Sequence, residues 1–230
     1  MFISSQDLEK IYQDDSVLIL DARSYKDYSK GHIPGSVSLD LFSFHWADTS
    51  QKGLVSFGEH MRKILSYAGI DENKKIIFYD HSSGMLAARG VWMCLYFSHP
   101  DVQMLDGGLS KWTKENLPTQ TESTIYKPTN LTTPINPSII IGFEELNENI
   151  GKVTIIDARS PDEFDGTMPR AARGGHIPTA KNIDWNNNLD NSGKLKSDSE
   201  LESLYLMDKE SQIVTYCQGA YRAANSYLSL

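Results

Sequence analysis

Residues 213–225 read Ile-Val-Thr-Tyr-Cys-Gln-Gly-Ala-Tyr-Arg-Ala-Ala-Asn. An apolar, β-branched run ends in Cys217, a short loop with a glycine follows, and the next residues suit the start of a helix. This order predicts a buried strand, a tight loop and a helix. The Cys217 thiol then lies over a helix N-terminus with Arg222 five positions further on, and both features stabilise a thiolate. The stretch therefore predicts a thiolate nucleophile that acts on an anionic substrate.

A cysteine after a strand is more often a small buried hydrophobic residue than a nucleophile. The context of Cys217 favours a function, because the chain contains the same layout twice. The repeated segments are VLILDARS at 17–24 and VTIIDARS at 153–160, GHIP at 31–34 and 175–178, and IIFYD at 76–80 and IVTYC at 213–217. Asp21 and Asp80 are 59 positions apart, and Asp157 and Cys217 are 60 apart. A repeat of this length is the size of a domain rather than of a solenoid unit.

We therefore expect two related domains, residues 1–120 and 138–230. Residues 121–137 are the expected linker, since they hold three prolines and show little apolar periodicity. Three prolines favour an extended, semi-stiff connector.

Within each domain, short apolar strands alternate with helical stretches. Residues 17–20 and 76–79 are apolar throughout, as in a parallel sheet covered on both faces, and residues 54–67 and 84–97 have helical spacing. This alternation predicts an α/β fold, with a parallel sheet flanked by helices in each domain. Ligands of such sheets bind beyond the carboxyl ends of the strands, which is where Cys217 lies.

Composition narrows the classes of function. The net charge of −8 argues against general binding of nucleic acid. No apolar run approaches the ~18 residues of a membrane span, and the polar N-terminus does not resemble a signal peptide. Two cysteines are too few for a disulfide framework, and a free reactive thiol fits a reducing compartment, so we expect a cytoplasmic protein. The six scattered histidines have no metal-ligand spacing, and we expect neither a metal nor a cofactor.

The motifs together resemble the rhodanese-type sulfurtransferases in their tandem, two-domain form. The matching pieces are DAR at 21–23 and 157–159, the two GHIP segments, LDGGLSKW at 105–112 and the Cys217 loop. The resemblance covers nearly the whole chain and implies a persulfide cycle. Cys217 would take the outer sulfur of a small anionic donor such as thiosulfate and pass it to cyanide, a thiol or a protein thiol.

The first domain of such proteins is usually inactive, and this chain fits that expectation. Asp80 occupies the nucleophile position, and Met85 falls where the second loop has Arg222. A carboxylate cannot carry sulfur in this way. We expect the first domain to be a structural partner that covers the active site.

The loop itself suits an anionic donor. Successive backbone N–H groups that point inward form an anion-binding nest, and Arg222 adds a permanent charge with a donor fork. The candidate substrate-binding residues of the loop are Gln218, Gly219, Ala220, Tyr221 and Arg222. The spacing from Cys217 to Arg222 is Cys-x4-Arg. The related phosphatases that this fold resembles have a longer, Cys-x5-Arg loop. The shorter loop therefore favours a sulfurtransferase over a phosphatase.

The identity of the donor is less defined. In the family that this chain resembles, members that use mercaptopyruvate usually have a short, neutral Cys-Gly-x-Gly-Val/Thr-Thr loop. They also have arginines in the middle of the second domain. Here Glu163 stands where one such arginine is expected, and Arg170 and Arg173 lie nearby after an insertion. We take Arg173 as a further candidate for substrate binding. The charged loop favours thiosulfate, with 3-mercaptopyruvate as the alternative.

Residues shared by both domains are more often structural than catalytic. We expect Asp157 and Arg159, like Asp21 and Arg23, to form an internal ion pair, and the GHIP segments to form turns.

Only 13 residues follow Cys217, whereas 32 positions separate Asp80 from Trp112. We therefore expect the second domain to be incomplete at its C-terminus, without a final strand and helix. This keeps two classes of function open: an enzyme that uses Cys217, and a non-catalytic module that binds sulfur or an anion.

Overall fold

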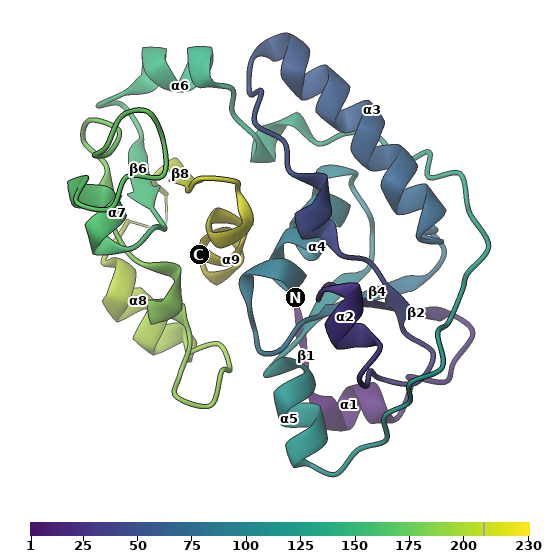
Figure 1. The fold of residues 1–230 in the computed structure, drawn as a ribbon. Coiled ribbons are helices and arrows are strands. Elements are labelled where there is room, and N and C mark those ends of the chain that lie inside the picture. Colours follow the sequence, from purple (N-terminus) through teal and green to yellow (C-terminus); the bar gives the residue numbers. More distant parts are fainter. Residues whose placement is uncertain (209) are drawn as a thin grey trace.

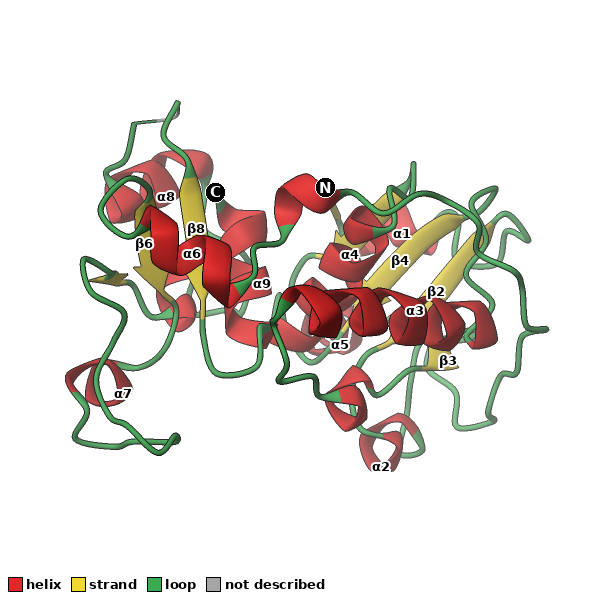
Figure 2. Cartoon of the chain, turned by 90° about the horizontal axis from the view of Figure 1, so that it is seen from above, coloured by secondary structure: helices red, strands yellow, loops and turns green. Residues whose placement is uncertain are grey.

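A computed structural model of the chain describes residues 1–208 and 210–230. It is an α/β protein with two parallel sheets, each flanked by helices (Figures 1 and 2). In chain order the elements are β1 (Phe2–Ile3), α1 (Ser5–Glu9), β2 (Val17–Asp21), α2 (Tyr25–Tyr28), β3 (Val37–Ser38), η1 (Leu41–Phe44), α3 (Gln51–Tyr67), β4 (Lys75–Tyr79), α4 (Met85–Tyr96), β5 (Val102–Leu105), α5 (Gly108–Lys114), η2 (Pro137–Ile139), α6 (Phe143–Asn149), β6 (Thr154–Asp157), α7 (Pro161–Asp165), β7 (Lys181–Asn182), η3 (Trp185–Asn188), α8 (Asp198–Tyr205), β8 (Ile213–Tyr216) and α9 (Tyr221–Ser229). The η elements are 3₁₀ helices.

The first domain is built on a parallel sheet with the order β1-β5-β4-β2-β3 among the described residues. Alternate residues of a strand point to opposite faces, so Leu18 and Leu20 of β2 pack with α3 and α4. Val17 and Ile19 pack on the other face with α1 and α5. Both faces are covered, which explains why this strand is apolar throughout. The predicted strands and helices of this domain are thus confirmed.

The second sheet has the order β7-β6-β8 and is also parallel, with these three strands among the described residues. β6 and β8 pair as β2 and β4 do. In the first domain β5 lies along the outer side of β4, whereas β8 has no such neighbour in the described part of the chain. Residues 76–79 of β4 are fully buried, but residues 213–216 of β8 are only half-buried. Within residues 1–208 and 210–230, the second sheet thus has no counterpart of β5, as the sequence predicted.

Helices α4 and α9, which follow the equivalent loops of the two domains, pack against each other across the interface (Figure 1). Ala224 and Leu228 of α9 are buried in the main hydrophobic core of the first domain. The Asn225 side chain donates a hydrogen bond of 2.9 Å to the Ser83 carbonyl oxygen in the loop before α4. This packing brings the loop after β8 against the first domain.

The segment expected as a linker packs along the first domain. Leu131 is only 1% exposed and belongs to the core of that domain. The Arg62 guanidinium on α3 donates to the carbonyl oxygens of Leu131 and Thr133, at 2.9 and 2.8 Å. The connection therefore binds to the surface that it crosses.

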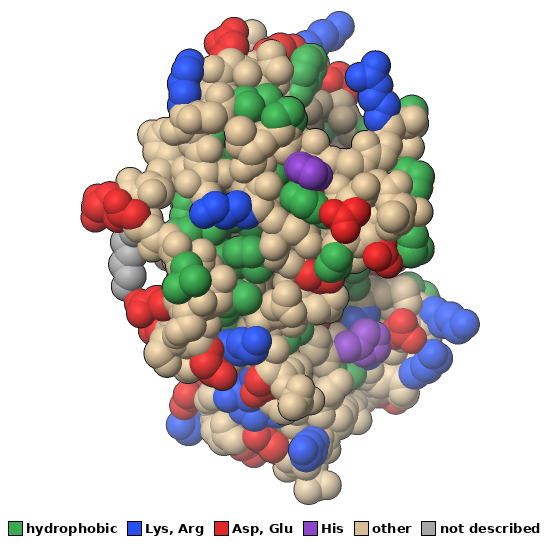
Figure 3. All heavy atoms as spheres, turned by 90° about the vertical axis from the view of Figure 1, so that its left-hand side faces the viewer, with side chains coloured by type: hydrophobic (Ala, Val, Ile, Leu, Met, Phe, Trp, Pro, Cys, Tyr) green, Lys and Arg blue, Asp and Glu red, His purple; other side chains and the backbone are tan. Residues whose placement is uncertain are grey.

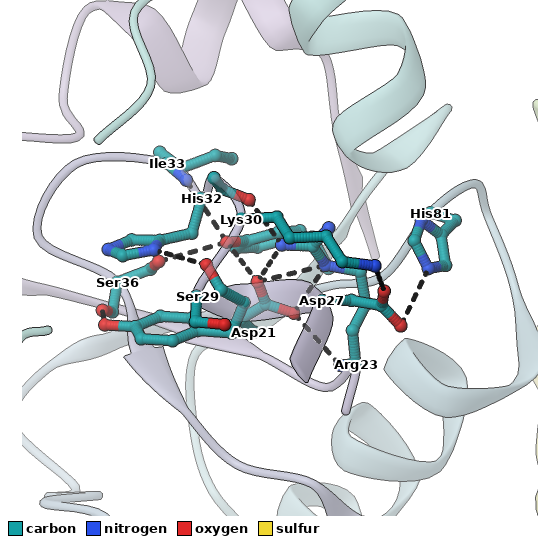
Figure 4. A network of polar contacts seen from close by, with 12 residues as sticks. Asp21, Arg23, Asp27, Ser29, Lys30, His32, Ile33, Ser36 and His81 are labelled. Atoms are coloured by element: carbon teal, nitrogen blue, oxygen red, sulfur yellow. Dashed lines mark hydrogen bonds and ion pairs between the residues drawn. The ribbon is translucent and has the colours of Figure 1, made fainter. Parts of the chain in front are cut away.

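The same buried ion pair lies at the carboxyl end of β2 in the first sheet and of β6 in the second. In the first domain, Arg23 Nη2 lies 2.5 Å from Asp21 Oδ2 and 2.8 Å from the Gly31 carbonyl oxygen (Figure 4). In the second, Arg159 Nη2 lies 2.5 Å from Asp157 Oδ2. It also donates to the Gly175 carbonyl oxygen, at 2.8 Å. These pairs hold the two GHIP turns, so the structural interpretation of the DAR motifs is confirmed.

The outer face of the second domain carries acidic and basic side chains interspersed with one another (Figure 3). Among the described residues, no helix is both long enough and apolar enough to cross a membrane.

Candidate active site

Cys217 directly follows β8, at the carboxyl end of the strand, and α9 begins at Tyr221. Its side chain is partly exposed and lines a cavity of about 850 Å³. Both domains form the walls of this cavity. The first domain contributes His45, Trp46, Phe57, Arg89 and Trp92, among others, and the second contributes the loop from Cys217 to Ala220. The predicted order of strand, loop and helix is confirmed, although the strand is half-buried rather than buried. Cys217 lines a space between the domains.

The loop offers backbone donors that have no acceptor. Among the described residues, no hydrogen bond engages the backbone N–H groups of residues 218–222. Ala220 at the N-cap of α9 has a φ of 63°, a left-handed conformation that costs a non-glycine residue about 1 kcal/mol. Such strain is typical of loops whose shape serves a function. Unengaged N–H groups at a helix N-terminus are an anion-binding arrangement.

Arg222 is paired with an acid. Its Nη1 atom lies 2.5 Å from Glu163 Oε2, and its Nη2 atom lies 3.0 Å from Glu163 Oε1. Glu163 is only 4% exposed. Hydrogen bonding to Arg222 lowers the pKa of Glu163 to about 2. Glu163 raises the pKa of Arg222, with a smaller contribution from Cys217. This pairing, which the sequence alone did not predict, compensates the charge of Arg222.

Two further candidates have structural contacts. The side chain of Tyr221 is buried, and its Oη donates to the Leu41 carbonyl oxygen of the first domain at 2.9 Å. Gly219 lies under the His45 ring, which a Cβ atom at this position would strike. Gln218 is exposed at the rim of the cavity. The first domain thus covers the loop, as expected.

The structure does not bring Arg173 to this site. Arg173 is exposed in the segment between α7 and β7 and is not among the residues that line the cavity. Its neighbour Arg170 is also exposed, with Nε 3.6 Å from Glu163 Oε1.

Arg89 is a residue of the cavity that the sequence analysis missed. It belongs to α4 in the first domain and is 7% exposed. A lone arginine within the apolar run 85–97 is a signal that was available in the sequence, since arginine is rarely fully buried without a partner.

The equivalent loop of the first domain contains its own anion. The Asp80 carboxylate accepts hydrogen bonds of 3.0 to 3.2 Å from the backbone N–H groups of Ser82, Gly84, Leu86 and Ala87. Asp80 is 4% exposed, and burial raises its pKa while these N–H groups lower it. In the first domain, the loop at the equivalent position therefore binds the carboxylate of its own Asp80.

Comparison with known proteins agrees with this architecture. The rhodanese-like domain model matches residues 4–115 and 143–230. A sulfur carrier protein, TtuD of Thermus thermophilus, is 30% identical over all of this chain and 86% of its own length. A putative thiosulfate sulfurtransferase of Mycolicibacterium smegmatis is 32% identical over 88% of this chain and 77% of its own.

Solved structures give the same result. The crystal structure of SseA from Escherichia coli, described in a study of 3-mercaptopyruvate sulfotransferases, superposes with a TM-score of 0.82 and 25% identity. It covers 99% of this chain and 92% of the other. An anaerobic ergothioneine biosynthesis enzyme from Chlorobium limicola shares the fold, with a TM-score of 0.86 at 18% identity. Because the family match spans both halves and a relative is 30% identical along the whole chain, this protein belongs to the rhodanese-type sulfurtransferases and has two rhodanese-like domains in tandem.

Proposed function

We propose that this chain is a thiosulfate sulfurtransferase that carries sulfur as a persulfide on Cys217. The observation that carries the proposal is the position of this thiol, at the foot of a loop whose backbone N–H groups have no acceptor, facing a cavity. A site of this kind binds a small anion next to a nucleophile. The relatives named as putative thiosulfate sulfurtransferases support the same activity.

In the first step, the Cys217 thiolate attacks the outer sulfur of thiosulfate. A bond forms between Sγ and that sulfur, the S–S bond of thiosulfate breaks, and sulfite leaves with the electron pair. In the second step, cyanide or a thiolate attacks the outer sulfur of the persulfide, and the Cys217 thiolate leaves. No external oxidant or reductant is needed, because each step is a displacement at sulfur.

The loop supports these roles for its residues. The N–H groups of Gln218, Gly219, Ala220 and Tyr221 would bind the anionic sulfur and the donor, and Arg222 would stabilise the thiolate while Glu163 holds its guanidinium in place. Arg173 remains a prediction. The charged Cys-x4-Arg loop favours thiosulfate, whereas the likeness to the Escherichia coli enzyme keeps 3-mercaptopyruvate as the second candidate.

We also propose that residues 1–120 and 138–230 are the two domains, joined by residues 121–137. Because a persulfide cycle requires a free thiol, we propose a reducing, cytoplasmic location.

Intact-mass spectrometry after incubation with thiosulfate, and separately with mercaptopyruvate, tests the proposal. We expect thiosulfate to add the mass of one sulfur atom, and cyanide to remove it, in the wild type but not in Cys217→Ser. A gain with mercaptopyruvate alone would overturn the donor and keep the mechanism. No gain from either donor in a folded protein would favour a non-catalytic module that binds anions.

A further inference from the structure

Arg89 is a buried guanidinium without an anionic partner. It is 7% exposed, and its Nε atom is buried with no hydrogen-bond acceptor. Within the described residues, none of the hydrogen bonds or ion pairs involves this side chain. Its guanidinium carbon lies 4.5, 5.4 and 5.8 Å from the ring centroids of Trp92, Phe57 and Tyr221. These rings supply cation–π contacts, but a buried charge without a counter-ion destabilises a fold.

Arg89 lies in the wall of the cavity that Cys217 also lines. Arg89 and Cys217 line the same cavity between the domains, and the packing of α4 on α9 brings them together. Tyr221, the first residue of α9, contacts Arg89 through its ring. Burial lowers the pKa of Arg89 to about 10, and Tyr221 and Cys217 oppose this shift. The side chain therefore stays charged at neutral pH.

Arg89 differs from Arg222 in that it lines the cavity and has no carboxylate partner among the described residues. Arg222 is compensated by Glu163 and does not line the cavity. Among the described lining residues, Arg89 is the one lysine or arginine, and the acidic lining residue, Glu145, is exposed on α6. The first reaction step brings a thiolate and a dianion together, and their repulsion is strong where water is excluded. An uncompensated cation in the wall would offset that repulsion.

We propose that Arg89 of the first domain is a donor-binding residue that holds the oxyanion end of the sulfur donor while its outer sulfur faces Cys217. The inference rests on the proposed function. The planar fork of the guanidinium suits two oxygens of a sulfonate or carboxylate. As the S–S bond breaks, the same fork stabilises the charge that accumulates on the leaving sulfite. The catalytically inactive domain thus supplies a part of the active site.

Replacement of Arg89 by methionine separates this role from a structural one. We expect kcat/KM for thiosulfate to fall about tenfold or more in Arg89→Met, mainly through KM. For a neutral acceptor such as dithiothreitol, kcat/KM should change less than about threefold, because donor binding is not part of that step. Arg89→Lys, which keeps the charge but loses the fork, should lie between. Lys63→Met removes the same charge from an exposed position on α3 and should leave both values unchanged.

Stability provides the second readout. Since Arg89→Met removes an unpaired buried charge, we expect its Tm to equal or exceed that of the wild type. A role limited to cation–π packing predicts the opposite, a lower Tm. Unchanged kcat/KM for thiosulfate in folded Arg89→Met would overturn the proposal. An equal loss in the donor and acceptor steps would do so too.

Binding can be measured without turnover. In Cys217→Ser, thiosulfate should raise the Tm more than sodium chloride of equal ionic strength does, and Arg89→Met in the same background should abolish the difference. If the wild type forms no persulfide, the proposed function fails, and this experiment still decides whether Arg89 binds the anion. An equal rise of Tm with and without Arg89 would overturn the inference alone.

Discussion

The Asp80 loop and the Cys217 loop have the same place in their domains and opposite states. Each loop follows a strand that pairs with the strand of the DAR motif, β4 with β2 and β8 with β6, and the two helices after the loops pack against each other. In the first loop, the Asp80 carboxylate binds four N–H groups of its own backbone. In the second, the N–H groups of residues 218–222 have no acceptor among the described residues. In the first domain the loop binds a carboxylate of its own chain, and we propose that the equivalent loop of the second domain binds an external anion in its place.

Residues in or next to each loop also form a hydrogen bond with the opposite domain. Ser83 in the first loop donates its N–H to the Gly193 carbonyl oxygen of the second domain, at 2.8 Å. Tyr221 after the second loop donates to the Leu41 carbonyl oxygen of the first domain. Each loop region is therefore hydrogen-bonded to a segment of the opposite domain.

Cys217→Asp would make the second loop resemble the first and should have the largest effect. We expect no persulfide with any donor, because a carboxylate cannot form one. The new carboxylate should bind the unengaged N–H groups, so the Tm should be higher than that of Cys217→Ser, and thiosulfate should no longer raise it. Mass spectrometry and thermal unfolding of both variants measure this. A Tm of Cys217→Asp below that of Cys217→Ser would show that the two loops differ in more than this residue.

Asp80→Ala removes the carboxylate that the first loop binds. Four N–H groups lose their acceptor, those of Gly84 and Ala87 being buried and those of Ser82 and Leu86 part-buried. We expect the free energy of unfolding to fall by about 3 kcal/mol. Asp80→Asn keeps an acceptor oxygen and removes a buried charge, so its loss should be about 1 kcal/mol or less. Urea unfolding at neutral pH measures both. Sulfate should restore part of the stability of Asp80→Ala, and the absence of any such rescue would contradict the view of this loop as an anion site.

Glu163→Gln tests a charge pair that has no counterpart at Met85 of the first loop. Arg222 holds the pKa of Glu163 at about 2, against an ordinary value near 4.5. The carboxylate therefore stabilises the folded state fully above about pH 5, and this contribution is lost as the pH falls towards 2. We expect Glu163→Gln to lose about 2 kcal/mol at pH 7.

Denaturant unfolding of the wild type and Glu163→Gln between pH 7 and pH 3 measures this contribution. The difference between the two proteins should shrink as the pH falls. A constant difference over that range would mean that the loss does not come from the charge of Glu163.

The smallest expected difference concerns the tyrosines beneath the two loops. Tyr79 Oη donates to Asp21 at 2.7 Å and is fully buried, whereas Tyr216 Oη donates to Asp157 at 2.5 Å and is half-buried. Tyr79→Phe also removes the bonds of this hydroxyl to Ile33 N–H and Ser36 Oγ, and Tyr216→Phe also removes the bond from Ile177 N–H. Each replacement should cost about 1 kcal/mol or more, with Tyr79→Phe the larger loss because its hydroxyl is more buried and has more partners. Thermal unfolding of the two variants ranks them. The reverse order would show that burial does not set the cost here.

Local patterns predicted most of the fold and the position of Cys217 at the end of a strand. Strand, loop and helix around Cys217 depend on neighbouring residues, and the repeat reveals the two domains without any contact across them. The pairing of Glu163 with Arg222 spans 59 positions, and the approach of Arg89 to Cys217 spans 128. Both depend on how α7 and α4 lie against α9, which periodicity and spacing do not encode. The lone charge in the apolar run of α4 was the local sign that Arg89 lies near the cavity of Cys217.

The burial of Ala224 and Leu228 in the core of the first domain has a consequence for synthesis. α9 follows β5 by more than 100 residues along the chain, yet it covers apolar side chains of α4. At about 5–20 residues per second, the ribosome needs on the order of ten seconds between the two elements. During that interval α9 does not cover this apolar face of the nascent N-terminal half, and exposed apolar surface of this kind promotes aggregation until it is covered.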